Sequence, residues 1–69
     1  MEKFILTLTK RDDKTVLSIH DSKAEAIAEG ENILKRLAYD AGFLAVIYGE
    51  IDSNNNVISR KYKLCHGWL

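Results

Sequence analysis

The residues best suited to chemistry are Cys65 and His66, which are adjacent in the chain. A thiol beside an imidazole is a pair that nucleophilic catalysis uses. Neighbouring side chains on a strand point to opposite faces, however, so these two groups are not expected to meet. The second histidine, His20, is far away in sequence, and zinc sites usually show paired ligands at short spacing. We therefore predict no catalytic residue, no metal site and no cofactor.

The segment 52–56 carries oxygen-bearing side chains at alternate positions, as a calcium-binding loop does. Such a loop needs a glycine at its sixth position and a bidentate glutamate at its twelfth. This chain has Val57 and Lys63 at those two positions. Asp and Asn side chains also bond the local backbone and tolerate positive φ, so the segment is predicted to be a plain hairpin turn.

Two groups of basic residues indicate nucleic acid as an alternative ligand. One lies in the loop 10–14 and the other surrounds Tyr62, and sheet-borne aromatic residues beside cations can stack bases and neutralise phosphates. Against this, ten acidic and ten basic residues cancel, which leaves no long-range field. Tyr62 is also expected to face the core. The alternative would use Lys10, Arg11, Arg60, Lys61 and Lys63.

A single helix is predicted over residues 22–41. Ser22 and Glu25 have the spacing of a capping box, and Gly42 is placed to end the helix. Gly30, in the middle of this helix, either permits a close approach, for instance by an aromatic ring, or is merely tolerated. The apolar positions recur at helical spacing, namely Ala24, Ile27, Ala28, Leu34, Leu37, Ala38 and Ala41.

Alternating apolar and polar residues predict strands on both sides of the helix. The expected layout is a first hairpin over 1–20, the helix over 22–41, a second hairpin over 43–65 and a tail over 66–69. The strand 43–51 is apolar on both faces, which favours a central place in the sheet. The fold class is therefore α+β: a ββαββ domain with a four-stranded antiparallel sheet and one helix packed on one face.

One helix covers only one face of such a sheet, so the other face is expected to be open and partly apolar. A 69-residue chain is marginally stable unless a disulfide, a metal or oligomerisation stabilises it. Its single cysteine excludes an internal disulfide. We therefore predict a homodimer, a higher oligomer or a protein partner on the open face or on a strand edge. Trp68 is either a lid over the core or a contact residue. The predicted interaction residues are Ile5, Thr7, Val16, Ile47 and Trp68.

The chain resembles a group of small, uncharacterised bacterial ββαββ proteins. The likeness covers roughly residues 15–64 and rests on the helix start 22–27, an apolar strand over 44–48, an Asn turn over 54–56 and a last strand over 57–62. The chain departs from that pattern by lacking a glycine in the second turn and by carrying Trp68. The group has no settled activity, so the resemblance implies the layout and no site residues.

The favoured function is a small, non-enzymatic, cytoplasmic interaction module of a bacterium or a mobile element. The apolar run 4–6 is too short for a signal peptide or a spanning helix, and a lone thiol is compatible with a reducing compartment. Nucleic-acid binding is the first alternative. An inhibitor of a larger enzyme, of the kind that phages and plasmids encode, is the second.

Overall fold

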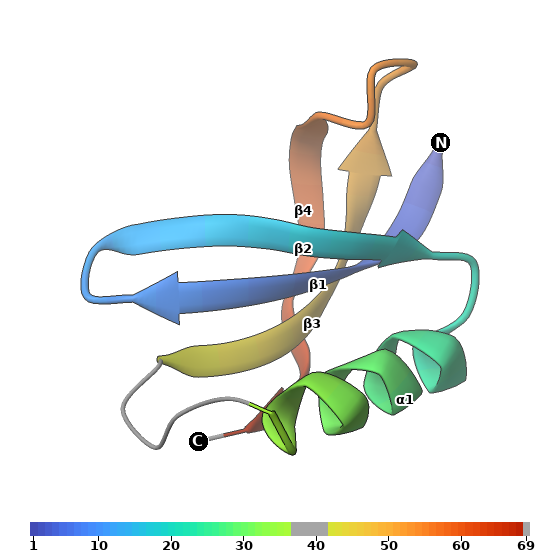
Figure 1. Ribbon diagram of the computed structural model, residues 1–69. Coiled ribbons are helices and arrows are strands. Elements are labelled where there is room, and N and C mark those ends of the chain that lie inside the picture. The colour runs from blue at the N-terminus through green and yellow to red at the C-terminus, as the bar shows by residue number, and fades with distance from the viewer. Residues whose placement is uncertain (37–41, 69) are drawn as a thin grey trace.

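The computed structural model describes residues 1–36 and 42–68, except the side chains of residues 63 and 64. Its elements are β1 (Glu2–Lys10), β2 (Asp13–His20), α1 (Lys23–Leu34), β3 (Phe43–Ile51) and β4 (Val57–Trp68). The four strands form one antiparallel sheet in the order β2-β1-β3-β4, and α1 packs on one of its faces (Figure 1). This confirms the predicted α+β class, the ββαββ layout and the central place of β3.

The helix is shorter than predicted. It begins as expected, because the Ser22 hydroxyl accepts a hydrogen bond from the Glu25 N–H at 3.2 Å. The reciprocal bond from the Ser22 N–H to the Glu25 carboxylate is not formed within the described residues. The helix ends at Leu34, well before Gly42, so the predicted end is wrong. Three of the predicted apolar positions lie outside the described residues: Leu37, Ala38 and Ala41.

The face that α1 presents to the sheet also differs from the prediction. Ala26 and Gly30 are buried, whereas Ala24 and Ala28 are exposed. Small alanines contribute little apolar area, so the larger isoleucines of the helix, at positions 27 and 33, decide which side turns inward. Those two side chains pack against the cluster that holds Leu6 and Val46.

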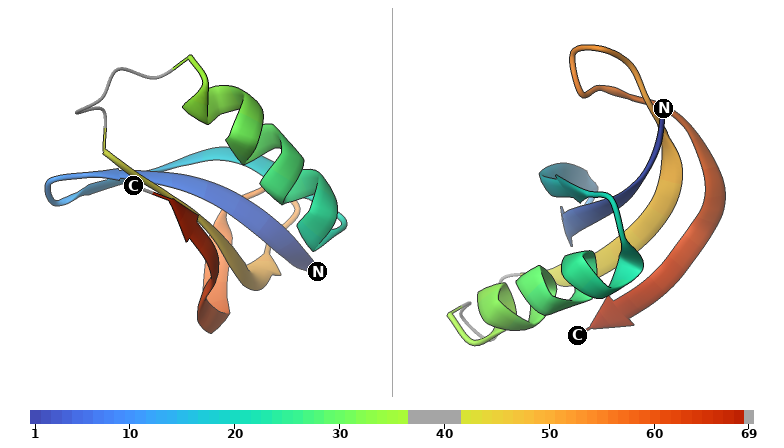
Figure 2. Two further views of the ribbon diagram at one scale, coloured as in Figure 1. Left: turned by 90° about the horizontal axis from the view of Figure 1, so that it is seen from below. Right: turned by 90° about the vertical axis from the view of Figure 1, so that its right-hand side faces the viewer.

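The sheet is strongly coiled, and the cause is the length of β4. Eight residues of β3 (44–51) lie opposite twelve residues of β4 (57–68), with three shifts of register along the ladder. Extra residues on one strand bend it and increase the local twist. Gly49 permits the close approach at one shift, where a Cβ atom would collide with the Ser59 carbonyl oxygen. Figure 2 shows the result, with β4 as the outer arc of a curved sheet.

Each face of the coiled sheet has its own apolar core. The helix side is built on Leu6, Ala26 and Val46. The other side is built on three isoleucines of β1 and β3, against which two partly buried side chains of β2 and β4 pack: Ile5, Ile47, Ile51, Ile19 and Val57. Coiling thus brings side chains of all four strands together on the face that no helix covers.

The first hairpin closes through a two-residue turn, Arg11–Asp12, between the paired residues Lys10 and Asp13. Arg11 has a φ of 57°, a backbone conformation that costs an L-residue about 1 kcal/mol or more and glycine nothing. We expect Arg11→Gly to raise the free energy of unfolding by about 0.5–1 kcal/mol in urea titrations. Lys14→Gly, in the regular part of β2, should lower it by a similar amount. A loss of stability in Arg11→Gly would show that the arginine side chain matters more than its backbone.

The predicted turn over residues 52–56 is confirmed. The Asp52 Oδ1 atom accepts from the N–H groups of Asn54 and Asn56, both at 2.9 Å, and Asn55 takes a positive φ of 63°. These backbone donors stabilise the charged carboxylate and hold the pKa of Asp52 below its usual value.

This lowered pKa makes the turn sensitive to acid. The carboxylate contributes stability that is fully present above the pKa of the unfolded chain, near 4, and that is lost as pH falls through the lower folded pKa. We expect Asp52→Asn to be less stable than the parent at pH 7 and to lose less stability between pH 5 and pH 2. Urea midpoints measured across that range check this. Ser53→Ala, in the same turn, should keep the parent's dependence on pH.

Candidate interaction surface

The face that no helix covers does not form an open surface. Ile5 is 0% exposed, Thr7 1% and Ile47 1%. The expectation that these three residues are available to a partner is therefore wrong. The cause is the coiling of the sheet, which turns this face into the second core. The buried Thr7 hydroxyl donates to the Ala45 carbonyl at 3.3 Å, so this core leaves no unpaired hydroxyl there.

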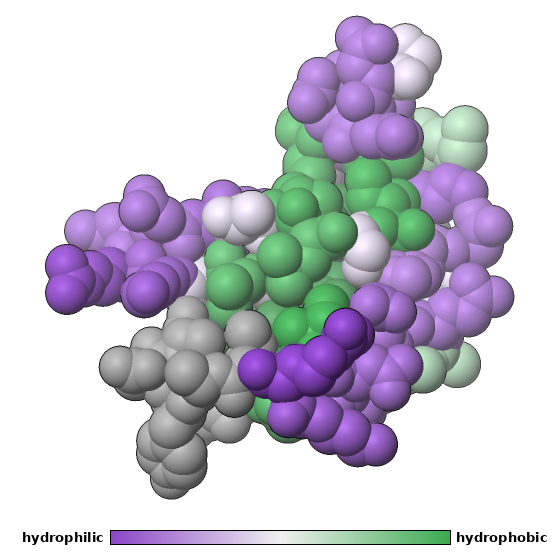
Figure 3. Space-filling model, in the orientation of Figure 1, coloured by the Kyte–Doolittle hydropathy of each residue, from purple (hydrophilic) through white to green (hydrophobic). Residues whose placement is uncertain are grey.

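Apolar side chains are instead exposed along β2, which is an edge strand. Val16 is 42% exposed and Leu17 is 37% exposed. Figure 3 shows apolar residues gathered over the middle of the side on which β2 lies in front, with hydrophilic residues around them. Of the five predicted interaction residues, Val16 is thus the one that stands at an accessible strand edge.

A shift of register in β2 breaks the alternation of its faces. Leu6 pairs with Ser18 and Thr7 pairs with Val16, so Leu17 is an additional residue in the ladder. Val16 and Ile19 consequently lie on the same side of the sheet, although alternation along β2 predicts opposite sides.

The opposite edge strand, β4, exposes Ile58 (61%) and Tyr62 (62%). The prediction that Tyr62 faces the core is wrong, because β4 lies on the outside of the curved sheet. The Tyr62 ring packs on Tyr48 with 5.6 Å between centroids, and Tyr48 packs on Phe4 at 4.7 Å. The three rings form a row across β1, β3 and β4.

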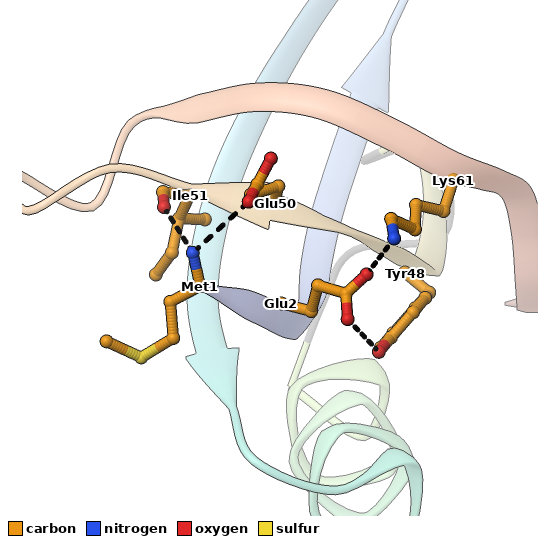
Figure 4. Close-up of polar contacts among 6 residues, drawn as sticks. All are labelled: Met1, Glu2, Tyr48, Glu50, Ile51 and Lys61. Atoms are coloured by element: carbon orange, nitrogen blue, oxygen red, sulfur yellow. Dashed lines mark hydrogen bonds and ion pairs between the residues drawn. The ribbon is translucent and has the colours of Figure 1, made fainter.

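Ion pairs and hydrogen bonds hold the polar end of this row (Figure 4). Lys61 pairs with the Glu2 carboxylate, and the Tyr48 hydroxyl donates to the same carboxylate at 3.3 Å. The bond from Lys61 lowers the pKa of Glu2, and that carboxylate raises the pKa of Lys61. Partial loss of water and then the neighbouring Glu2 raise the pKa of Tyr48. Lys61 is therefore already partnered within the chain.

The chain start is fixed beside this network. The Met1 ammonium donates to the Ile51 carbonyl at 3.2 Å and lies 3.6 Å from the Glu50 carboxylate, as Figure 4 also shows. These contacts extend the pairing of β1 with β3 up to the 52–56 turn.

The two groups of basic residues predicted for nucleic acid do not come together. Arg60 pairs with Gly49, which pairs with Lys3. Lys10 lies seven residues beyond Lys3 along β1, a distance of about 23 Å at strand spacing. In addition, β1 lies two strands away from β4 in the sheet. The structure does not describe the Lys63 side chain. The four predicted residues whose side chains the structure describes therefore form no continuous basic surface.

Trp68 is part of β4, not of a tail, and its indole covers the helix side of the core. The ring is so close to Gly30 that a Cβ atom there would stand 2.7 Å from the Trp68 Cζ3 atom. Its Nε1 donates to the Glu31 carboxylate at 3.0 Å, and its ring packs edge-on against His66 at 4.4 Å between centroids. Of the two roles considered for Trp68, the lid is the one that the structure shows.

The half-buried Cys65 packs against the same helix-side core. A polar hollow of about 420 Å³ lies elsewhere, between the start of the chain, the end of β2 and the 52–56 turn. It holds the Lys3–Asp21 ion pair, which lowers the pKa of Asp21, and His20, which contacts the Ser18 hydroxyl at 2.7 Å. Within residues 1–36 and 42–68, no three His, Cys, Asp or Glu side chains gather in a way that could hold a metal ion.

No helix in the described part of the chain has the length and apolar character needed to cross a membrane. Comparisons of the chain with protein-family models, with curated proteins and with solved structures give no match.

Proposed function

We propose that this protein is a small, non-enzymatic interaction module that binds a partner strand along the outer edge of β2. The observation that carries the proposal is the contrast between the two surfaces predicted for binding. The face without a helix is closed at Ile5 and Ile47, whereas β2 exposes Val16 and Leu17 along an outer edge that pairs with no other described strand. An edge strand offers a row of backbone donors and acceptors, and adjacent apolar side chains add burial to those bonds.

The β2 edge fits this role better than the β4 edge. The ladder of β4 has three register shifts, and bulges of this kind blunt an edge against pairing. The β2 ladder has one shift, and its residues 13–16 pair with β1 without interruption. A partner strand therefore meets a more regular backbone on β2.

Affinity capture from the native host, compared between matched variants, tests the proposal. Val16→Lys and Leu17→Lys place charges on the β2 edge, and Ile58→Lys places one on the exposed part of β4. All three side chains are exposed, so each variant should keep the circular dichroism and melting of the parent. We expect the β2 variants to lose proteins that the parent and Ile58→Lys both retain. Equal capture by all four chains would overturn the proposal.

Nucleic-acid binding is a second candidate because Tyr62 is exposed, which the sequence did not suggest. Its ring already stacks on Tyr48 and offers its outer face to a base, with Arg60 nearby on the same strand. The pairing of Lys61 with Glu2 weakens this candidate. A gel shift with single-stranded oligonucleotides at low salt decides it: binding must weaken as salt rises and must be lost in Tyr62→Ala.

A further inference from the structure

Resting on the proposed function, we infer that the strand received by β2 is β2 of a second copy of this chain. The two strands run antiparallel around a two-fold axis that is perpendicular to the sheet, and together the copies form one eight-stranded sheet. The pleat of β2 and its charges select a single register for this pairing.

The partners on β1 assign each β2 residue to a face of the sheet, because directly opposite residues share a face. Leu8, Leu6 and Phe4, on the helix side, pair with Thr15, Ser18 and His20. Lys10 belongs to the same side by alternation and pairs with Asp13. On the other face, Thr9, Thr7 and Ile5 pair with Lys14, Val16 and Ile19.

A two-fold axis perpendicular to the sheet keeps each face on the same side, so residues that pair across it must share a face. When a strand pairs antiparallel with its own copy, the two residue numbers in every pair have the same sum, and this sum defines the register. Five registers, with sums from 31 to 35, pair at least six residues of each β2. Sums of 31, 32 and 34 place opposite faces together, for instance Lys14 against His20 in the last. Sums of 33 and 35 remain. The extra residue Leu17 is the reason that these two odd sums satisfy the condition, whereas a sum of 31 fails because it pairs Thr15 with Val16.

Charge separates the two remaining registers. A sum of 33 puts Lys14 opposite Ile19 and aligns Asp12 with Asp21, which places like charges together. A sum of 35 puts Lys14 opposite Asp21 of the second copy, and symmetry repeats the pair. Asp21 is 77% exposed and already binds Lys3, so a second cation can share its carboxylate. The register with the sum of 35 is therefore favoured.

Apolar burial supports the same register. It places Val16 opposite Ile19 of the second copy, twice, on the face of the second core. Ile47, Ile5 and Ile19 already form a row across β3, β1 and β2, and Val16 of the second copy continues that row. The interface thus makes the second core of one copy continuous with that of the other. It also covers the Val16 side chain, which is 42% exposed in the single chain.

Disulfide trapping in a Cys65→Ala background tests the register. Mixing Thr15→Cys protein with His20→Cys protein should give a disulfide-linked heterodimer, because opposite Cα atoms stand about 4.5–5.5 Å apart, within reach of a disulfide. Mixing Thr15→Cys with Ser18→Cys should not, because those positions lie opposite each other only when the sum is 33. Preferential linkage of positions 15 and 18 would overturn the register.

Light scattering and analytical ultracentrifugation test self-pairing itself. We expect a dimer whose dissociation constant rises about tenfold in Lys14→Glu, since two attractive pairs become repulsive. Lys10→Glu makes the same change in net charge away from the interface and should leave the constant unchanged. A monomer at millimolar concentration, with no linkage of positions 15 and 20, would overturn the inference. The proposed function would then still stand if host proteins are captured through Val16 and Leu17, and would fall only if that capture also fails.

Discussion

Replacing Ile5 by lysine is expected to unfold the protein. Ile5 is completely buried in the core opposite the helix, beside Ile47 and Ile51. An ammonium group there has no partner, and burying an unpaired charge costs several kcal/mol in addition to the lost apolar contacts. A domain of this size has a free energy of unfolding of only about 5 kcal/mol, so the substitution removes most or all of it.

Val16→Lys is the matched control, since Val16 lies on the same face of the sheet but is 42% exposed. At a concentration where the protein is monomeric, we expect it to change the free energy of unfolding by about 0.5 kcal/mol or less. Circular dichroism and urea titration of the two variants provide the measurement. A folded Ile5→Lys protein that merely fails to associate would show that the face without a helix is open after all.

Gly30→Ala is expected to destabilise the protein by about 1–3 kcal/mol, although alanine normally favours a helix over glycine by about 1 kcal/mol. The added methyl group would collide with the Trp68 ring, which must then leave its place between α1 and the sheet. That movement breaks the bond from the indole to Glu31. Trp68→Ala alone should cost about 3 kcal/mol because it empties the site of a large, partly buried ring.

The effect of Gly30→Ala on the free energy of unfolding is expected to change sign when Trp68 is absent, and a double-mutant cycle measures this change. With Trp68 replaced by alanine, Gly30→Ala meets no ring and should stabilise the protein by about 1 kcal/mol. Ala28→Gly, on the exposed side of the same helix, should cost about 1 kcal/mol whether or not Trp68 is present. Trp68 is the single tryptophan, so its fluorescence should shift to the red in Gly30→Ala. Equal effects of Gly30→Ala in both backgrounds would mean that the ring does not pack on this glycine.

Local patterns were sufficient for the layout of the fold. Alternation marked the strands, the Ser22–Glu25 spacing marked the helix start, and the Asp52 turn behaves as short polar side chains predict. Of the two interpretations of Gly30, close approach by another group is the one that the structure shows, and that group is the Trp68 ring. Each of these signals is carried by residues close together in the sequence or by a single unusual residue.

The faces of the sheet could not be predicted in the same way. Alternation assumes that every residue has one partner across the ladder, and the extra residues at Leu17 and along β4 break that rule. Coiling then buries Ile5 and Ile47 and exposes Tyr62, in each case the reverse of the expectation. The helix end was predicted too late because apolar residues continue at helical spacing in the sequence past Leu34. The candidate site changed accordingly, from an open face to a strand edge.

The central position of β1 has a consequence for how the chain reaches its native state. Each hairpin pairs residues close in sequence, but β1 pairs with β3 between residues 34 to 48 positions apart, from Thr9 with Phe43 to Glu2 with Glu50. Hairpins form in microseconds, whereas closing so long a stretch of chain is slower. We therefore expect joining of the two halves along this seam to limit the folding rate, with both apolar cores completed in that one step.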